Sequence, residues 1–150
     1  MITFTKVSLP YGWLGNMSPY PILYKGKEWR TSEALFQSLR FDDESIKEQI
    51  RLEKSPMGAK MKAKKFSKKM VIEPMSDEDV ENMRMCLKLK IEQHPELKEK
   101  LKNTGSEIIV EDVSKRNGQR HLFWGGKIVN ENLIGQNTLG NLWMELRNNI

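Results

Sequence analysis

The spacing of apolar residues along the chain predicts a protein built mostly of helices. The clearest stripe lies near the C-terminus, where residues 139, 142, 143 and 146 are Leu, Leu, Trp and Leu, the i, i+3, i+4, i+7 spacing of one helix face. This helix is expected to begin near Asn137. A long helix is predicted after the capping sequence that starts at Ser76, and it ends at His94-Pro95. Further helices are expected over residues 32–40, 44–52, 56–65 and 95–103.

A smaller set of short segments is typical of strands. Residues 2–8 alternate weakly and predict an edge strand, and residues 22–29 predict a hairpin that turns at Gly26. Two more strands are expected over residues 107–111 and 121–124, with a polar loop over 114–120 between them. No repeat or linker interrupts the pattern. The sequence therefore predicts one α+β domain over residues 1–150, compact and mostly helical, with a small sheet.

One polar row stands out in the helix predicted over residues 32–40. Thr31 is a good N-cap, and Glu33, Gln37 and Arg40 follow at i, i+4 and i+7, on a different face from Leu35 and Leu39. Two interpretations are open. The row is either a solvated ridge, which the pattern alone favours, or the wall of a polar pocket.

Charge adds a second feature. The formal net charge is +5, and seven lysines without any acidic residue lie between Lys54 and Ile72. Such a run is most often a solvated helix face, and the alternative is a surface that attracts phosphate. Lysines act here as point charges and lack the fork geometry that specifies a base.

Several chemistries are poorly supported. The two histidines, His94 and His121, stand alone, so no metal site is expected. The one cysteine, Cys86, cannot form an internal disulfide, which fits a reducing cytoplasm, and its place in an amphipathic helix favours a buried structural role. The sequence shows neither a long apolar run nor a secretory signal, so a cytoplasmic protein without a membrane partner is expected.

The segment Gly135–Gly140 resembles part of a phosphate loop but lacks the lysine and the hydroxyl that a triphosphate and magnesium need. Two roles remain open for it, an anion-binding helix start and close helix packing at Gly140. The remaining chemistry is a carboxylate on a polar helix face, with aromatic residues in loops and at strand ends. That set fits cleavage of a glycosidic bond at a ribose, where a carboxylate stabilises an oxocarbenium-like transition state. No cofactor is expected.

Several segments, taken in order, resemble the NADAR family of N-glycosidases. Together they cover nearly the whole chain, and the ordered set is more specific than any piece. The segments are Leu14-Gly15-Asn16-Met17-Ser18-Pro19, residues 24–37 from Tyr24 to Gln37, Ser55-Pro56-Met57-Gly58-Ala59-Lys60, residues 85–90 with Pro95-Glu96-Leu97 and residues 101–105, Phe123-Trp124-Gly125, and residues 135–147.

The resemblance implies a compact α+β fold and a set of site residues. It makes Glu33 the catalytic carboxylate, and His121 a second catalytic group, because His121 stands where the family often carries Asp. Arg40 stands where the family usually has lysine. Substrate-binding roles are implied for Asn16, Trp29, Gln37, Arg40, Lys60, Trp124, Gly125, Asn137 and Gly140.

The implied reaction is hydrolysis of a base–ribose bond. The favoured substrate is an ADP-ribosylated nucleobase, guanine in particular, in a nucleotide or within DNA or RNA. The alternatives are ribosylamino pyrimidine intermediates related to riboflavin, and a pocket that binds ADP-ribose without cleaving it. The run of lysines from Lys54 favours the phosphate-rich substrate.

Overall fold

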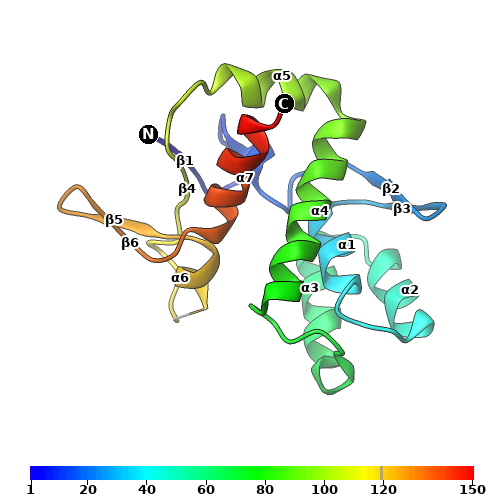
Figure 1. The fold of residues 1–150 in the computed structure, drawn as a ribbon. Coiled ribbons are helices and arrows are strands. Elements are labelled where there is room, and N and C mark those ends of the chain that lie inside the picture. Colours follow the sequence, from blue (N-terminus) through cyan, green and yellow to red (C-terminus); the bar gives the residue numbers. More distant parts are fainter. Residues whose placement is uncertain (119) are drawn as a thin grey trace. The chain divides into compact units, whose positions relative to one another are not determined.

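The computed structural model describes residues 1–118 and 120–150 (Figure 1). The chain divides into two compact units, which are considered separately. One consists of residues 16–94, and the other combines residues 1–15 with residues 95–150. Helices dominate, and among the described residues the strands form two-stranded pairs, so the predicted α+β class is confirmed. The prediction of one domain over residues 1–150 stays a prediction.

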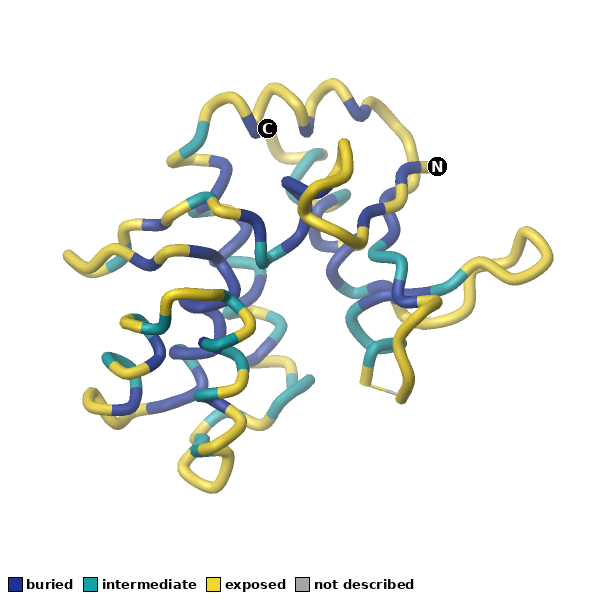
Figure 2. The backbone as a smooth tube through the Cα atoms, turned by 180° about the vertical axis from the view of Figure 1, so that it is seen from behind, coloured by how far each residue is buried: buried dark blue, intermediate teal, exposed yellow. Residues whose placement is uncertain are grey.

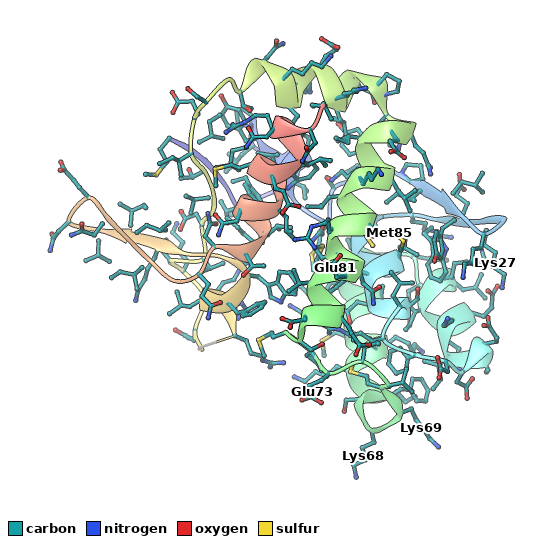
Figure 3. All side chains as sticks on the ribbon, in the orientation of Figure 1. Lys27, Lys68, Lys69, Glu73, Glu81 and Met85 are labelled. Atoms are coloured by element: carbon teal, nitrogen blue, oxygen red, sulfur yellow. The ribbon has the colours of Figure 1, made fainter. Side chains whose placement is uncertain are left out.

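The 16–94 unit is built around one short, fully buried helix. All seven residues of α1, Ser32–Ser38, are buried (Figure 2), and helices α2, α3 and α4 and strand β3 pack against it. The elements of the unit are β2 (Ile22–Tyr24), β3 (Lys27–Trp29), α1, α2 (Glu44–Leu52), α3 (Pro56–Lys65), the 3-10 helix η2 (Ser67–Lys69) and α4 (Asp77–Gln93). Lys27 in the hairpin and Lys68 and Lys69 in η2 point away from the ribbon (Figure 3).

Side-chain caps set where these helices begin. The hydroxyl of Thr31 accepts a hydrogen bond from the Ala34 N–H, and the hydroxyl of Ser55 accepts one from the Gly58 N–H. Each cap satisfies a backbone donor that the first helical turn leaves open. The β2–β3 hairpin turns through Lys25 and Gly26, both with positive φ, which is the backbone that a two-residue turn requires. The predicted hairpin at Gly26 is therefore confirmed.

The second unit joins the two ends of the chain. Strand β1 pairs with β4 in parallel, and α7 packs on β4. The fully buried indole of Trp143 donates from Nε1 to the Leu14 carbonyl at 2.9 Å and meets the Trp13 ring edge-on, with the centroids 6.1 Å apart. The elements are β1 (Ile2–Phe4), the 3-10 helix η1 (Gly12–Leu14), α5 (Pro95–Asn103), β4 (Ile109–Glu111), α6 (His121–Trp124), β5 (Lys127–Val129), β6 (Asn132–Ile134) and α7 (Thr138–Asn148).

The predicted helices are confirmed at 44–52, 56–65 and 95–103, and in the long and last helices, but the strand predicted over 121–124 is wrong. Those residues form the short helix α6, closed by a hydrogen bond of 2.8 Å from the Gly125 N–H to the His121 carbonyl. The strand-like pairing with β4 is made two residues after this segment, where the Gly126 N–H donates to the Glu111 carbonyl at 2.9 Å.

Two further differences concern the unit that combines residues 1–15 with residues 95–150. The hairpin of β5 and β6 was not predicted, and the strands expected over 2–8 and 107–111 are shorter, with three residues each. In the loop predicted over 114–120, residues 114–118 lie outside helices and strands, and residue 119 lies outside the described residues.

Candidate functional site

Glu33 lies in the first turn of α1, directly inside the Thr31 cap. Its residue exposure is only 9%, and the backbone N–H of Glu33 donates to the Asn16 carbonyl at 3.0 Å. The dipole of α1 makes this end of the helix electropositive. Glu33 is therefore a buried acidic side chain in the first turn of α1.

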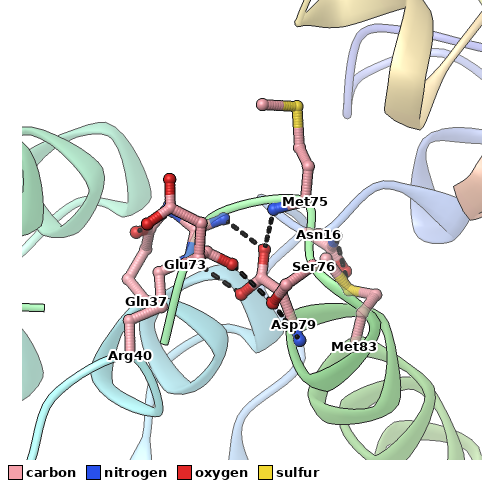
Figure 4. Close-up of polar contacts among 8 residues, drawn as sticks. All are labelled: Asn16, Gln37, Arg40, Glu73, Met75, Ser76, Asp79 and Met83. Carbon is pink, nitrogen blue, oxygen red and sulfur yellow. Dashed lines mark hydrogen bonds and ion pairs between the residues drawn. The ribbon is translucent and has the colours of Figure 1, made fainter. Parts of the chain in front are cut away.

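Asn16 ties the loop before β2 to the start of α1. Its side-chain oxygen accepts a hydrogen bond of 2.9 Å from the Ser32 hydroxyl, and its Nδ2 donates to the Met83 sulfur at 3.3 Å (Figure 4). The backbone carbonyl of Asn16 also accepts the Glu33 N–H. Asn16 therefore contacts both the residue that carries the carboxylate and helix α4. The structure thus brings two of the predicted site residues, Asn16 and Glu33, into direct contact.

Gln37 and Arg40 are also buried, with exposures of 5% and 8%. The interpretation of the polar row as a solvated ridge is therefore wrong. Arg40 binds the carboxylate of Asp79 through Nε and Nη2, at 2.9 and 2.7 Å, and its Nη1 donates to Gln37 Oε1 at 3.2 Å (Figure 4). Asp79 is fully buried and also accepts the Met75 N–H at 2.9 Å. Arg40 therefore has an internal anionic partner, and its first role is to join α1 to α4.

Lys90 is a buried cation that the sequence analysis did not single out. Its residue exposure is 0%, and Nζ donates to the Ser18 hydroxyl at 2.9 Å and lies 5.5 Å from the centre of the Tyr20 ring. Burial lowers the pKa of Lys90 to about 7, because the charged ammonium loses its hydration. The available signal was the resemblance itself, whose fourth segment includes this lysine.

One face of α4 carries all of these partners. Asp79, Met83, Cys86 and Lys90 follow at i, i+4, i+7 and i+11, a spacing that keeps them on one side of a helix. Burial, together with the nearby charges of Glu33 and Asp79, raises the pKa of the Cys86 thiol far above its usual range. The thiol is therefore protonated and unreactive, which confirms the structural role expected for Cys86. A polar seam, defined here as Asn16, Glu33, Gln37 and Arg40 on one side and this face of α4 on the other, forms the candidate site.

Two other predicted residues of this unit lie outside the seam. Trp29 is buried, and its Nε1 has no hydrogen-bond partner among the described residues, which leaves a polar N–H in an apolar interior. Lys60 is half-buried on α3 and makes no ion pair within the described part of the chain. Both residues sit on elements that pack against α1.

His121, Trp124 and Gly125 belong to the other unit, in and directly after α6. His121 and Trp124 are half-buried, and the Trp124 ring meets Phe123 edge-on with the centroids 5.1 Å apart. Gly125 has a packing role, since a Cβ there would lie 2.7 Å from the Glu111 carbonyl oxygen and 2.6 Å from Val113 Cγ1. No larger residue fits this position without movement of β4 or Val113.

Asn137 and Gly140 hold α7 against β4. The Asn137 side chain accepts the Glu111 N–H at 3.1 Å and donates to the Ile109 carbonyl at 2.8 Å, with its backbone in the left-handed region at φ 51°. A Cβ on Gly140 would lie 2.1 Å from the same Ile109 carbonyl oxygen. The packing role considered for Gly140 is confirmed, and the amide of Asn137 is already occupied by the strand.

Two absences among the described residues bear on other chemistries. Over residues 1–118 and 120–150, no cluster of three or more His, Cys, Asp or Glu side chains is arranged to hold a metal ion. Among the same residues, no helix combines the length and the apolar character needed to cross a bilayer.

Comparison with known proteins agrees with the α+β fold. The NADAR domain model matches residues 3–150. The chain belongs to the NADAR family, a family of N-glycosidases.

Two relatives and one solved structure illustrate the match. N-glycosidase YbiA of Escherichia coli K12 is 36% identical over 151 residues, covering 98% of this chain and 86% of that protein. N-glycosidase Npun_R5314 of Nostoc punctiforme is 30% identical over 155 residues, covering 99% and 92%. The NMR structure of the E. coli protein YbiA superposes with a TM-score of 0.80 at 35% identity, covering 99% of this chain and 83% of that one.

Proposed function

We propose that this chain hydrolyses the bond between an ADP-ribosyl group and a nucleobase, with guanine as the favoured base. The observation that carries the proposal is the buried carboxylate of Glu33, fixed at a helix start within the polar seam. The NADAR family membership supplies the reaction class, and the basic run after Lys54 favours a substrate rich in phosphate.

Glu33 has two tasks in this reaction. As the C1–N bond of the ribosyl group breaks, the departing base takes the bonding electrons and the sugar carbon becomes cationic. The carboxylate stabilises that charge and accepts a proton from the water that adds to the carbon. The products are free ADP-ribose and the base, which gains one proton. Its place in the first turn of α1 puts Glu33 at the electropositive end of that helix, which supports both tasks.

The other residues of the seam position this carboxylate. Asn16 holds the Glu33 backbone, and the Arg40–Asp79 pair holds α1 against α4. Orientation of this kind contributes to rate because small displacements of a reacting group are costly. His121, Trp124 and Lys60 keep the roles that the resemblance implies, as separate proposals.

The test is incubation of the protein with ADP-ribosylguanosine, with released guanosine measured by chromatography. We expect Glu33→Gln to lower kcat by about 10²–10⁴-fold while the protein folds normally. Glu44→Gln is the matched control, because Glu44 is also an acid in the first turn of a helix but is exposed. Near-normal turnover by the Glu33 variant removes Glu33 from the catalytic role.

The same assay separates the alternatives. Turnover of a ribosylamino pyrimidine but not of ADP-ribosylguanosine assigns the small substrate. Calorimetric binding of ADP-ribose without release of base from any compound identifies a binding module.

A further inference from the structure

Four exposed lysines lie together at the end of α3 and in η2, and they are called the lysine surface here. They are Lys64, Lys65, Lys68 and Lys69, and Figure 3 shows the last two pointing away from the ribbon. Within the described residues none of the four ammonium groups is paired with a carboxylate. The flanking acids in the sequence are Glu53 and Glu73. The surface is a concentrated positive charge that the fold leaves open to solvent.

The core requirements of α3 do not account for this charge. Ala59 and Ala63 are the residues of α3 that are fully buried, and they lie four apart on the inner face. Lys64 and Lys65 complement the helix dipole in the last turn. Lys68 and Lys69 lie beyond that turn, in η2, where the dipole of α3 gives no comparable benefit.

A nearby hollow does not use this charge. It has a volume of about 450 Å³ and is lined in part by Lys54, Glu53 and Lys62. The Lys62 ammonium lies 3.4 Å from the Glu53 carboxylate, so the positive charge of Lys62 is already balanced by an ion pair. None of the four lysines of the lysine surface lines this hollow.

Apolar groups interleave with the lysines. Met57 and Met61 are 51% and 52% exposed on α3, and Phe66 is half-buried, with the Lys65 ammonium 5.5 Å from its ring centre. An aromatic ring among cations is typical of surfaces that follow a phosphate backbone while bases stack, and exposed thioethers make adaptable contacts with a partner. A uniform hydrated cationic face would not need the exposed methionines.

We infer that the lysine surface docks the phosphate backbone of a single-stranded nucleic acid that carries the modified base. This inference rests on the proposed function and narrows its substrate from a nucleotide to a polynucleotide. A single strand is favoured because an enzyme that acts on a base must receive it out of the stack. The surface supplies affinity without sequence preference, since lysines contact phosphates as point charges.

The experiment measures binding of a fluorescein-labelled, unmodified 12-nucleotide DNA strand by anisotropy between 50 and 200 mM KCl. For four phosphate contacts, the slope of log K against log salt is expected to be about −3 for the wild-type chain. Changing all four lysines of the surface to Gln should weaken binding at 50 mM KCl by at least about tenfold and flatten the slope. The fourfold Arg variant, which keeps the charge, should bind like the wild type.

The matched control changes four other exposed lysines to Gln, namely Lys6, Lys98, Lys100 and Lys115. It removes the same charge and should keep affinity within about threefold. Equal losses in both Gln variants would show that only net charge matters and would overturn the inference. Preference for phosphatidylserine vesicles over DNA, lost in the lysine-surface Gln variant, would also overturn it by assigning a membrane partner. Because the DNA is unmodified, binding is scored independently of hydrolysis, whose failure would count against the proposed function alone.

Discussion

The guanidinium of Arg40 holds both carboxylate oxygens of Asp79, at 2.9 and 2.7 Å, and so joins the end of α1 to the first turn of α4. Asp79 is fully buried and the Arg40 side chain is 10% exposed. Two parallel bonds in this setting fix direction as well as distance. The pair therefore sets the spacing between the helix that carries Glu33 and the helix that carries Lys90.

Arg40→Lys is expected to destabilise the protein although the charge is kept. An ammonium cannot make the two parallel bonds, and an incompletely satisfied Asp79 stays buried. We expect a loss of about 3 kcal/mol in the free energy of unfolding, measured by urea denaturation. Lys27→Met, which breaks an exposed pair with Glu48, is the control and should cost less than about 1 kcal/mol. A cost as small for Arg40→Lys would show that the pair does not hold the helices together.

Lys90 should make stability depend on pH above neutrality. Its pKa is lowered to about 7 from an ordinary value of 10.5. Between these values the unfolded chain carries the proton and the folded chain does not, so stability rises with pH across this window. Below about pH 7 both states are protonated and the penalty of burying the charge is fully present.

Replacing the buried ammonium by an apolar side chain tests this linkage. Lys90→Met should be more stable than the wild type at pH 7, with an advantage that shrinks toward pH 10 by up to about 1.4 kcal/mol per pH unit. Thermal and urea unfolding at pH 7, 8, 9 and 10 measure the difference. Lys88→Met, on the exposed side of the same helix, should show no such trend. A constant difference between Lys90→Met and the wild type would contradict the lowered pKa.

His121 gives a prediction about activity. If it replaces the aspartate that the family often carries, His121→Asp should keep much of the turnover, whereas His121→Ala should lose about 10²-fold in kcat. Equal activity of the Ala and wild-type proteins, at equal thermal stability, would give His121 a structural role only.

Much of the fold could be predicted because local signals agree with the final packing. The caps at Thr31, Ser55 and Ser76 mark helix starts in both sequence and structure. The strand predicted over 121–124 was wrong because four large apolar or aromatic residues fit a strand as well as a helical turn. Only the pairing of Gly126 with Glu111, which is remote in sequence, decides between them.

The candidate site was only partly predictable for a related reason. The spacing of Glu33, Gln37 and Arg40 placed them on one face, but spacing cannot tell a solvated face from a buried one. The deciding partner is Asp79, which lies 39 residues after Arg40 and has an ordinary place in a capping sequence. The burial of Lys90 could not be recognised from the sequence either, because a lysine in an amphipathic helix is usually exposed.

Gly140 offers a test of the packing between α7 and β4. A Cβ at this position would lie 2.1 Å from the Ile109 carbonyl oxygen and 2.6 Å from the side chain of Asn137, and both neighbours are held by hydrogen bonds to each other. Gly140→Ala must therefore push the helix from the strand. We expect a loss of about 2–3 kcal/mol in the free energy of unfolding, in spite of the better helix propensity of alanine.

Gly58→Ala is the matched control for this substitution. Gly58 lies in α3, and a Cβ there would approach the Glu53 carboxylate and the Ser55 hydroxyl, which are the ends of side chains rather than backbone. We expect its free energy of unfolding to stay within about 1 kcal/mol of the wild type. Similar costs at both positions would mean that α7 can move away from β4 without loss. In that case the buried amide of Asn137 would not fix the start of α7, and the helix would be held by other contacts, such as those of the Trp143 indole and the Arg147 guanidinium.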